Sequence, residues 1–396
     1  MTNRATNSPE VKVLVFPRSP NPYQRELYTA MAASDRLVVR YVDGPTPSQT
    51  LNLLALPLLL AIGRLRGYRI LHVHWVYSFG VAWAHGRRAR RVVERWYSFT
   101  LAVASALGLK MVWTAHNLVP HEPVFVDDVA ARRALVARCD AVIAHDDSAA
   151  TIVRTWGARR VAVVPGGVEL RANGDTLRRT QACAAIAADP RPMRALFFGS
   201  IRDYKGVDVL LDALASLHPD VALHVDVVGP CLDPARRTVL EAMVRRMPVP
   251  ERVDARFDYV PDDELAAHIA ASDFGVFPFR SVTNSSSVLH SLAAGLPVII
   301  PSLAALGDVP EGAAIRYQPA DGRDGLVHAL TAAATMDCVQ RAAMVASAVE
   351  FASTRTWPKA AAATWVIFEE LLADAPTGLA RRALSTIAAV GTPVGR

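Results

Sequence analysis

The feature that most constrains the fold is an alternation of short apolar runs with longer amphipathic segments, which occurs twice along the chain. Such alternation is typical of parallel strands that are connected by crossover helices. In the first half we expect strands at 12–16, 37–42, 69–75, 110–114, 141–144 and 161–164, and helices at 22–33, 49–62, 81–107, 129–138 and 148–156.

The pattern pauses at Gly166-Gly167 and at a polar, Ala-rich stretch, and then starts again. In the second series we expect strands at 195–198, 223–228, 256–259, 274–277, 297–300 and 315–317, with helices between them and a last helix at 357–374. A chain of 396 residues suits two α/β domains. We therefore predict two facing, doubly wound Rossmann-like domains: 1–170 on the acceptor side, a linker at 171–192, 193–355, and 356–396 as a helix that returns to the first domain and a tail.

Composition narrows the class of protein. Apolar residues make up 52% and charged residues 20%, which argues against disorder. The longest apolar run, 51–62, contains Pro57 and is shorter than the roughly 20 residues that cross a bilayer. The N-terminus lacks a signal-peptide pattern, and the four cysteines have no metal-ligand or redox spacing. We expect a cytoplasmic protein.

Charge is distributed unevenly. The first 185 residues carry 24 Lys and Arg against 13 Asp and Glu, whereas the whole chain has 43 against 37. A basic first half favours a polyanionic partner such as a membrane surface. The alternative is a compositional preference for Arg without a function.

The segment that follows the strand at 195–198 has the composition of an anion site. Gly199 allows a tight turn, and the next backbone N–H groups lead into a helix N-terminus. Arg202 and Lys205 add the positive charge that a diphosphate needs. The alternative is that Arg202 and Lys205 are ordinary solvated surface charges.

A second polar segment follows the strand at 274–277. Hydroxyl and amide side chains at 283–287 precede a helix that stops at Gly295-Leu-Pro297. These side chains and the helix N-terminus offer donors to a phosphate. A plain N-cap cluster is the alternative, but strand ends in open α/β sheets are where ligands bind.

The motifs G-x5-K-G-V-D, ASDFGVFPF and HSLAAGLPV, with V-H-W, W-T-A-H-N and V-P-G-G-V in the first half, resemble GT-B-fold glycosyltransferases, especially glycosyltransferase family four. The resemblance covers residues 11–375 and is most specific at 195–301. It implies transfer of a sugar from a GDP- or UDP-sugar to a glycan or lipid-linked glycan, in exopolysaccharide or cell-envelope synthesis. The donor-binding residues it implies are Gly199, Arg202, Lys205, Thr283, Asn284, Ser285, Ser286 and His290.

The sequence departs from that family at its E-x7-E carboxylates, whose two positions are Val282 and His290 here. Ser200 also stands where an Arg often follows the glycine, so Arg202 is the expected substitute. These departures are similar to a divergent branch of bacterial exopolysaccharide transferases, some of which invert. The alternative is a catalytically degenerate relative that binds nucleotide or membrane.

Candidates for catalysis lie in the first half. An inverting transfer needs a base, and His116 and Glu122 rank first among the local candidates, ahead of His121, Asp127 and Asp128. His116 also resembles a family position that contacts the donor sugar. A retaining transfer needs no such base.

On the acceptor side we place Arg18, Tyr23 and His74, with a purely structural turn as the alternative for the loop at 17–25. Period two puts His72 and His74 on one face of a strand and Val73 and Trp75 on the other.

Two further partners are weighed on sequence grounds. Arginines at 64–69 and 87–91 beside aromatic residues favour an anionic membrane surface, against the alternative of packed helices with an exposed Arg face. No nucleic-acid motif accompanies the charge. The first strand is followed by FPRSPNPYQRE, which has no glycine and so argues against a dinucleotide-dependent oxidoreductase. With no metal-ligand cluster in the sequence, we expect a metal-independent reaction without a cofactor.

Overall fold

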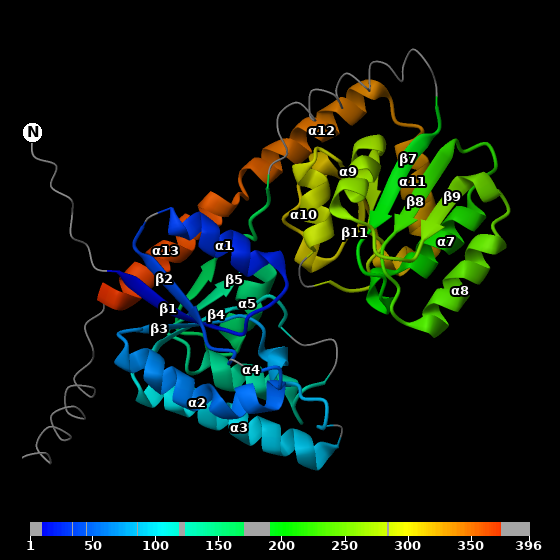
Figure 1. Cartoon of the computed structure of the whole chain (residues 1–396). Helices are drawn as coiled ribbons and strands as arrows, with labels where there is room; N and C mark the ends of the chain where they lie inside the picture. Colours follow the sequence, from blue (N-terminus) through cyan, green and yellow to red (C-terminus); the bar gives the residue numbers. More distant parts are fainter. Residues whose placement is uncertain are drawn as a thin grey trace, which may run out of the picture. The chain divides into compact units, whose positions relative to one another are not determined.

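The computed structural model describes residues 10–33, 35–44, 46–84, 86–118, 123–169, 191–282 and 285–373. The chain divides into two compact units (Figure 1). The first contains the residues up to Gly167 and the helix that starts at Trp357, and the second spans Val168–Thr356.

The first unit is built on a parallel sheet with the strand order β2-β1-β3-β4-β5-β6. Its inner strands are short and almost wholly buried, as expected for a sheet covered on both faces. The strands are β1 Val11–Phe16, β2 Leu37–Tyr41, β3 Ile70–Val73, β4 Lys110–Thr114, β5 Ala141–Ala144 and β6 Val161–Val163.

Helices cover the two faces of this sheet and bury separate apolar clusters. The helices α1 and α13 lie over one face, and α2 and α3 over the other (Figure 1). Side chains alternate along β1, so that Val13 packs toward α1 and Leu14 toward α2. The helices are α1 Pro22–Ala32, α2 Gln49–Leu65, α3 Arg87–Ala106, α4 Asp128–Val136, α5 Asp147–Thr155 and α13 Trp357–Ala373, with a 3-10 turn at Val76–Phe79.

The second unit is also a parallel sheet, with the order β12-β11-β10-β7-β8-β9. Its first strand, β7, lies beside its fourth, β10, so that the chain winds outward in both directions from that pair. The strands are β7 Met193–Phe198, β8 Leu223–Val228, β9 Val253–Arg256, β10 Phe274–Val276, β11 Val298–Pro301 and β12 Ala314–Tyr317.

Amphipathic helices complete the second unit. The helix α7 packs against α8 and α11, and α10 packs against α12. The helices are α7 Val207–Ser216, α8 Pro234–Arg245, α9 Asp262–Ala271, α10 Ser286–Ala293, α11 Gly322–Ala334 and α12 Cys338–Ser353. Short 3-10 turns lie at Asp203–Lys205, Pro250–Arg252, Ala304–Leu306, Glu311–Ala313 and Pro319–Asp321.

The α/β class and both series of strands are confirmed, and several predicted boundaries are wrong, most clearly at β9 and α3. The strand predicted at 256–259 is β9, which ends at Arg256, because apolar Tyr259 is exposed and contributes nothing to the core. The helix predicted from residue 81 begins at Arg87. Most of the predicted linker lies outside the described residues. Within the described ranges, every helix falls short of the length or apolar content that crossing a bilayer requires.

Candidate functional site

The carboxyl ends of β7 and β10 form the topological switch point of the second sheet. Successive strands proceed from β7 toward β8 on one side and from β10 toward β11 on the other. Open α/β sheets bind ligands at such a point, because the loops after the two strands separate there. The loops in question contain Gly199–Gly206 and Phe277–Ser285.

Glycines let three loops approach one another at this edge. Gly206 has φ of 69°, and a Cβ atom there would lie 2.0 Å from the Pro278 carbonyl oxygen. A Cβ at Gly229, in the loop after β8, would lie 2.2 Å from the Gly199 carbonyl oxygen. No side chain fits in either gap. The loops after β7, β8 and β10 are therefore in backbone contact.

Lys205 is buried where these loops meet. Its Nζ lies 4.6 Å from the centre of the Phe279 ring, a cation–π arrangement. Among the described residues it forms neither a hydrogen bond nor a salt bridge. Burial lowers the pKa of Lys205 to about 8, because the charged ammonium has lost water without gaining an anion. A buried ammonium of this kind would be stabilised by an anionic ligand, so Lys205 is a candidate for binding one.

Arg280 locks the β10 loop onto the β7 loop. Its backbone N–H donates to the Tyr204 carbonyl at 2.8 Å, and its guanidinium donates to the Asp203 carbonyl at 2.7 Å. The same guanidinium pairs with Asp208 at 2.9 Å, which lowers the pKa of that carboxyl against the effect of its burial. Arg280 is thus neutralised by Asp208, whereas Lys205 is not. This pair could not be predicted from the sequence, because its members are 72 positions apart.

The N-terminus of α10 lies beside Gly199. Ser285 caps the helix by accepting from the Val288 N–H at 3.3 Å, and Ser287 is buried with its Oγ next to Gly199. The helix dipole and the first N–H groups of α10 therefore add to the positive potential near this loop.

In the first unit, histidines follow the ends of β3, β4 and β5 and form a hydrogen-bonded row. His74 Nδ1 lies 3.0 Å from His116 Nε2, and His116 Nδ1 lies 3.1 Å from His145 Nε2. Tyr28, on α1, bonds to both His74 and His72. All four imidazoles are buried. We call His72, Tyr28, His74, His116 and His145 the histidine row.

Aromatic rings hold the row in place. The Trp75 ring stacks on His116 with centroids 4.4 Å apart, and the Tyr23 ring meets His116 edge-on at 4.5 Å. Trp357, at the start of α13, lies against Tyr23. The prediction that Trp75 faces away from the histidines is wrong, because β3 ends at Val73 and period two ends with it.

Burial keeps His72, His74 and His116 neutral. It lowers the pKa of His72 to about 3 and the pKa of both His74 and His116 well below the ordinary value, since each charged imidazolium would lose water. The neighbouring histidines lower the pKa of His116 further.

Comparisons with known proteins agree across both units. Residues 7–172 match the family model described as Glycosyltransferase Family 4, and residues 192–336 match the one described as Glycosyl transferases group 1. The chain is a GT-B glycosyltransferase of family-four type.

This glycosyltransferase has curated relatives of similar length. It is 28% identical over 317 residues to a GDP-mannose:glycolipid 4-beta-D-mannosyltransferase of Xanthomonas campestris pv. campestris, an alignment that covers 77% of this chain and 78% of the relative. It is also 28% identical to a D-inositol 3-phosphate glycosyltransferase of Xylanimonas cellulosilytica, over 76% of this chain and 72% of that one.

Solved structures share the fold of the glycosyltransferase. Sucrose-phosphate synthase from Thermosynechococcus elongatus aligns with a TM-score of 0.67 and 18% identity, over 92% of this chain and 99% of that one. Anabaena Alr3699/HepE in complex with UDP and glucose aligns with a TM-score of 0.62 and 18% identity, over 91% and 99%.

The structure brings some of the predicted donor residues together. Gly199, Lys205 and Ser285 lie on the converging loops, Arg202 and Ser286 are exposed beside them, and His290 is exposed on α10. Val282, at the first lost carboxylate position, packs against the core. Thr283 and Asn284 lie outside the described residues. The roles of all these residues in donor binding remain predictions.

The predicted acceptor-side and catalytic residues of the glycosyltransferase are also placed only in part. Tyr23, His74 and His116 are buried together, whereas Arg18 is exposed, with its guanidinium over the Tyr41 ring. Glu122 lies outside the described residues. Both nitrogens of His116 are engaged in the row, and its role as a base stays a prediction. His145 was missed, although its position directly after a buried strand was a usable signal.

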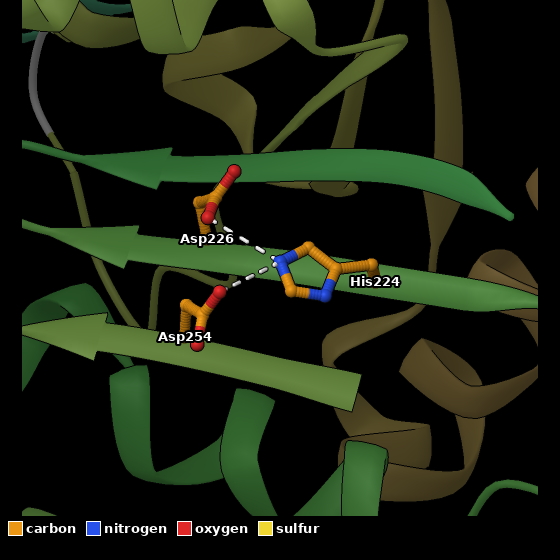
Figure 2. Close-up of side chains that lie close together, drawn as sticks. All are labelled: His224, Asp226 and Asp254. Atoms are coloured by element: carbon orange, nitrogen blue, oxygen red, sulfur yellow. Dashed lines mark hydrogen bonds and ion pairs between the residues drawn. The ribbon is translucent and has the colours of Figure 1, made fainter. Parts of the chain in front are cut away.

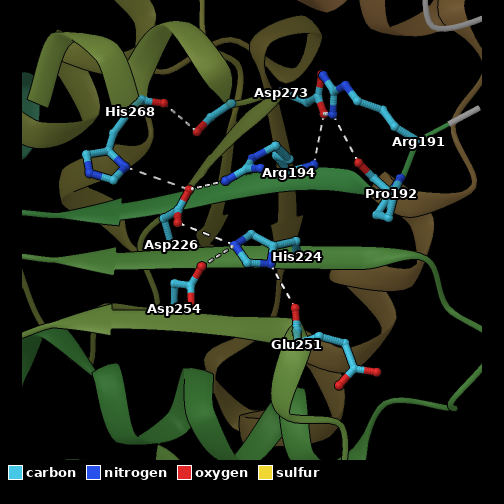
Figure 3. A network of polar contacts seen from close by, with 10 residues as sticks. Arg191, Pro192, Arg194, His224, Asp226, Glu251, Asp254, His268 and Asp273 are labelled. Carbon is cyan, nitrogen blue, oxygen red and sulfur yellow. Dashed lines mark hydrogen bonds and ion pairs between the residues drawn. The ribbon is translucent and has the colours of Figure 1, made fainter. Parts of the chain in front are cut away.

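A polar network occupies the amino-terminal half of β8 and β9. Figure 2 shows His224 Nε2 facing Asp226 and Asp254, 3.4 Å from a carboxylate oxygen of each. Within the described ranges these three are the one group whose ligand atoms lie close enough to share a metal ion. Arg194 pairs with Asp226 at 3.0 Å (Figure 3), so this buried carboxylate already has a cation. His224 pairs in register with Arg194 near the start of β7, at the opposite edge from Gly199.

Proposed function

We propose that this glycosyltransferase transfers a hexose from a nucleoside-diphosphate sugar to a lipid-linked glycan, in bacterial exopolysaccharide or envelope-glycan synthesis. The observation that carries the proposal is Lys205, a buried ammonium at the switch point of the second sheet that has no anion beside it among the residues the structure describes. The name of the Xanthomonas relative, with GDP-mannose as donor and a glycolipid as acceptor, supports the same substrate classes.

The leaving group is the nucleoside diphosphate, whose charge grows as the bond to the sugar breaks. Lys205 and the N–H groups at the start of α10 are fixed before the donor arrives, so they stabilise that charge without reorganising. We therefore propose a reaction that needs no metal ion, with Arg202 as a second, exposed cation at the mouth of the loop.

A transfer that inverts the anomeric carbon requires a base for the acceptor hydroxyl. His116 and Glu122 are the proposed candidates. In the structure His116 Nε2 lies 3.0 Å from His74 Nδ1, so His116 acts as a base at Nε2 only if an acceptor hydroxyl replaces His74 there. A retaining transfer would leave both residues with roles in binding alone.

The experiment is a transfer assay. Purified protein is first screened with GDP-mannose, GDP-glucose, UDP-glucose and UDP-galactose for selective thermal stabilisation, and the stabilising donor is then incubated with a lipid-diphosphate-linked oligosaccharide. We expect one donor to stabilise the protein and its sugar to appear on the lipid, with activity unchanged by EDTA. Stabilisation without transfer would favour the degenerate relative, and loss of activity that Mn²⁺ restores would overturn the metal-independent proposal.

We further propose that α2 and α3 place the enzyme on the anionic inner face of the plasma membrane. Leu51, Leu54, Leu58 and Leu65 recur on one side of α2 and are exposed, Leu58 by 63%. The helix α3 lies beside α2 (Figure 1) and exposes Val92 and Phe99. Soluble proteins seldom leave an apolar stripe of this length uncovered.

Charge supports a lipid surface as the partner of this stripe. Arg87, Arg88, Arg91 and Arg95 are exposed on α3, and none forms a salt bridge within the described part of the chain. Each arginine near an anionic leaflet contributes about 1 kcal/mol, while the leucines enter the headgroup region. Co-sedimentation with vesicles measures this binding.

A further inference from the structure

The histidine row is joined by six hydrogen bonds that run from one hydroxyl to one backbone carbonyl. Four of them are described above, and among these Tyr28 Oη lies 2.8 Å from His72 Nδ1. At one end of the row His72 Nε2 lies 2.7 Å from Thr114 Oγ1. At the other end His145 Nδ1 lies 2.9 Å from the Val164 carbonyl oxygen. Thr114 and Val164 are themselves buried.

The Val164 carbonyl determines which atom is the donor and which the acceptor in every bond of the row. Because a carbonyl oxygen only accepts, His145 carries its proton on Nδ1, which leaves Nε2 of the neutral ring as an acceptor. His116 must then donate from Nδ1, and its Nε2 must accept from His74 Nδ1. The same logic makes Tyr28 donate to His74 Nε2 and accept from His72, and makes Thr114 donate to His72 Nε2.

All four histidines are thereby held as the Nδ1–H tautomer. Free histidine side chains favour the Nε2–H form, so the row imposes the less populated state four times. A charged imidazole at His116 or His145 would place two N–H groups against each other, which agrees with the burial of both. The row also ends at a carbonyl that takes up no proton, so it orients its members and does not conduct protons to solvent.

We propose that His145 is the positioning residue of this site: through its bond to the Val164 carbonyl it fixes the proton of His116 on Nδ1. Nε2 is then the His116 atom that accepts, either from His74 or from a substrate hydroxyl that replaces it. With the opposite tautomer His116 would offer an N–H there, and a hydroxyl would have to accept. His145 itself acts only through His116.

The tautomers are measured by long-range ¹H–¹⁵N correlation spectra of the protein labelled in histidine, with each ring assigned by single substitution. In the wild-type protein we expect His74, His116 and His145 all to be protonated on Nδ1. A signal from His116 that is protonated on Nε2 would overturn the proposal. This measurement does not depend on the enzyme's substrates.

Two substitutions at His145 separate positioning from packing. His145→Gln keeps an acceptor oxygen near the place of Nε2, whereas His145→Leu fills the space without one. We expect His116 to keep its Nδ1 proton in His145→Gln and to lose that preference in His145→Leu, with melting temperature monitored in both. A His116 that stays protonated on Nδ1 in His145→Leu would also overturn the proposal.

The kinetic consequence rests on the proposed function and is measured separately with the donor that the transfer assay identifies. We expect kcat/KM to fall about tenfold in His145→Leu, the size of one misdirected hydrogen bond, and to recover in His145→Gln. Equal activity of the two variants would overturn the role in positioning. Confirmed tautomers with no transfer activity in the wild type would instead contradict the proposed function alone.

Discussion

At the scale of single residues, Lys205 and the histidines show opposite uses of burial. Burial disfavours the charged form of both kinds of side chain. The histidines stay neutral and form hydrogen bonds to one another. Lys205 has no such partner among the described residues, so its remaining means of recovering the lost solvation is a ligand. The sequence predicted Lys205 from the loop pattern alone. It did not predict the buried state or Phe279 beneath the ammonium, because both depend on a loop some 70 positions away.

The lowered pKa of Lys205 predicts how donor affinity depends on pH. A bound diphosphate stabilises the ammonium, so the pKa in the complex lies above the value of about 8 in the free protein. Below that pH the lysine is charged in both states and affinity is constant. Above it binding takes up a proton, so affinity falls by up to about tenfold per pH unit.

Calorimetric titrations between pH 6.5 and 9.5 test this dependence, and buffers with different ionisation enthalpies detect the proton uptake. In Lys205→Ala the pH-dependent component should vanish. Affinity that is flat across this range in the wild-type protein would mean that Lys205 does not contact the donor.

At the scale of elements, periodicity predicted most strands and helices. It failed where the apolar pattern of the sequence does not match the strand or helix that forms. The edge strand β9 ends at Arg256, but apolar residues continue at alternate positions through Phe257 and Tyr259, which is why its predicted position was three residues late. His145 was missed because its significance comes from β4 and β5 lying side by side. Period two correctly put His72 and His74 on one face, since both bond to Tyr28, but it failed at Trp75, which lies beyond the end of β3 at Val73.

The exposed leucines of α2 give a prediction at this scale. Leu54→Glu combined with Leu58→Glu puts two carboxylates on the stripe that is proposed to enter the leaflet, so binding to phosphatidylglycerol vesicles should fall about tenfold or more. Donor binding should not change, because the second unit is untouched.

A matched control carries two equally acidic substitutions on exposed apolar residues of the second unit, Val239→Glu with Val339→Glu. It should bind vesicles as the wild type does. An equal loss of vesicle binding in both double variants would show that the effect comes from net charge and not from the α2 leucines. Unchanged vesicle binding of the α2 variant would contradict the membrane proposal.

At the scale of the whole molecule, each unit repeats one architecture and carries a different kind of site. Both sheets are parallel and six-stranded, with the first strand beside a strand that follows it by more than one step. The second unit holds the cationic loops, and the first holds the neutral histidine row and the basic helix α3. The uneven charge of the sequence therefore follows the division into units: the excess of basic residues belongs to the first unit, and the proposed donor loops belong to the second.

The measurement that tests the central claim most directly is the affinity of the stabilising nucleotide-sugar for wild type, Lys205→Ala and Arg245→Ala, by calorimetry at pH 7. Arg245 is an exposed cation at the far end of α8 and controls for the loss of one positive charge from the same unit. We predict a loss of about tenfold or more for Lys205→Ala, the cost of one charge-assisted phosphate contact, and none for Arg245→Ala. Equal affinity of all three proteins would contradict the assignment of the donor diphosphate to the loops after β7 and β10.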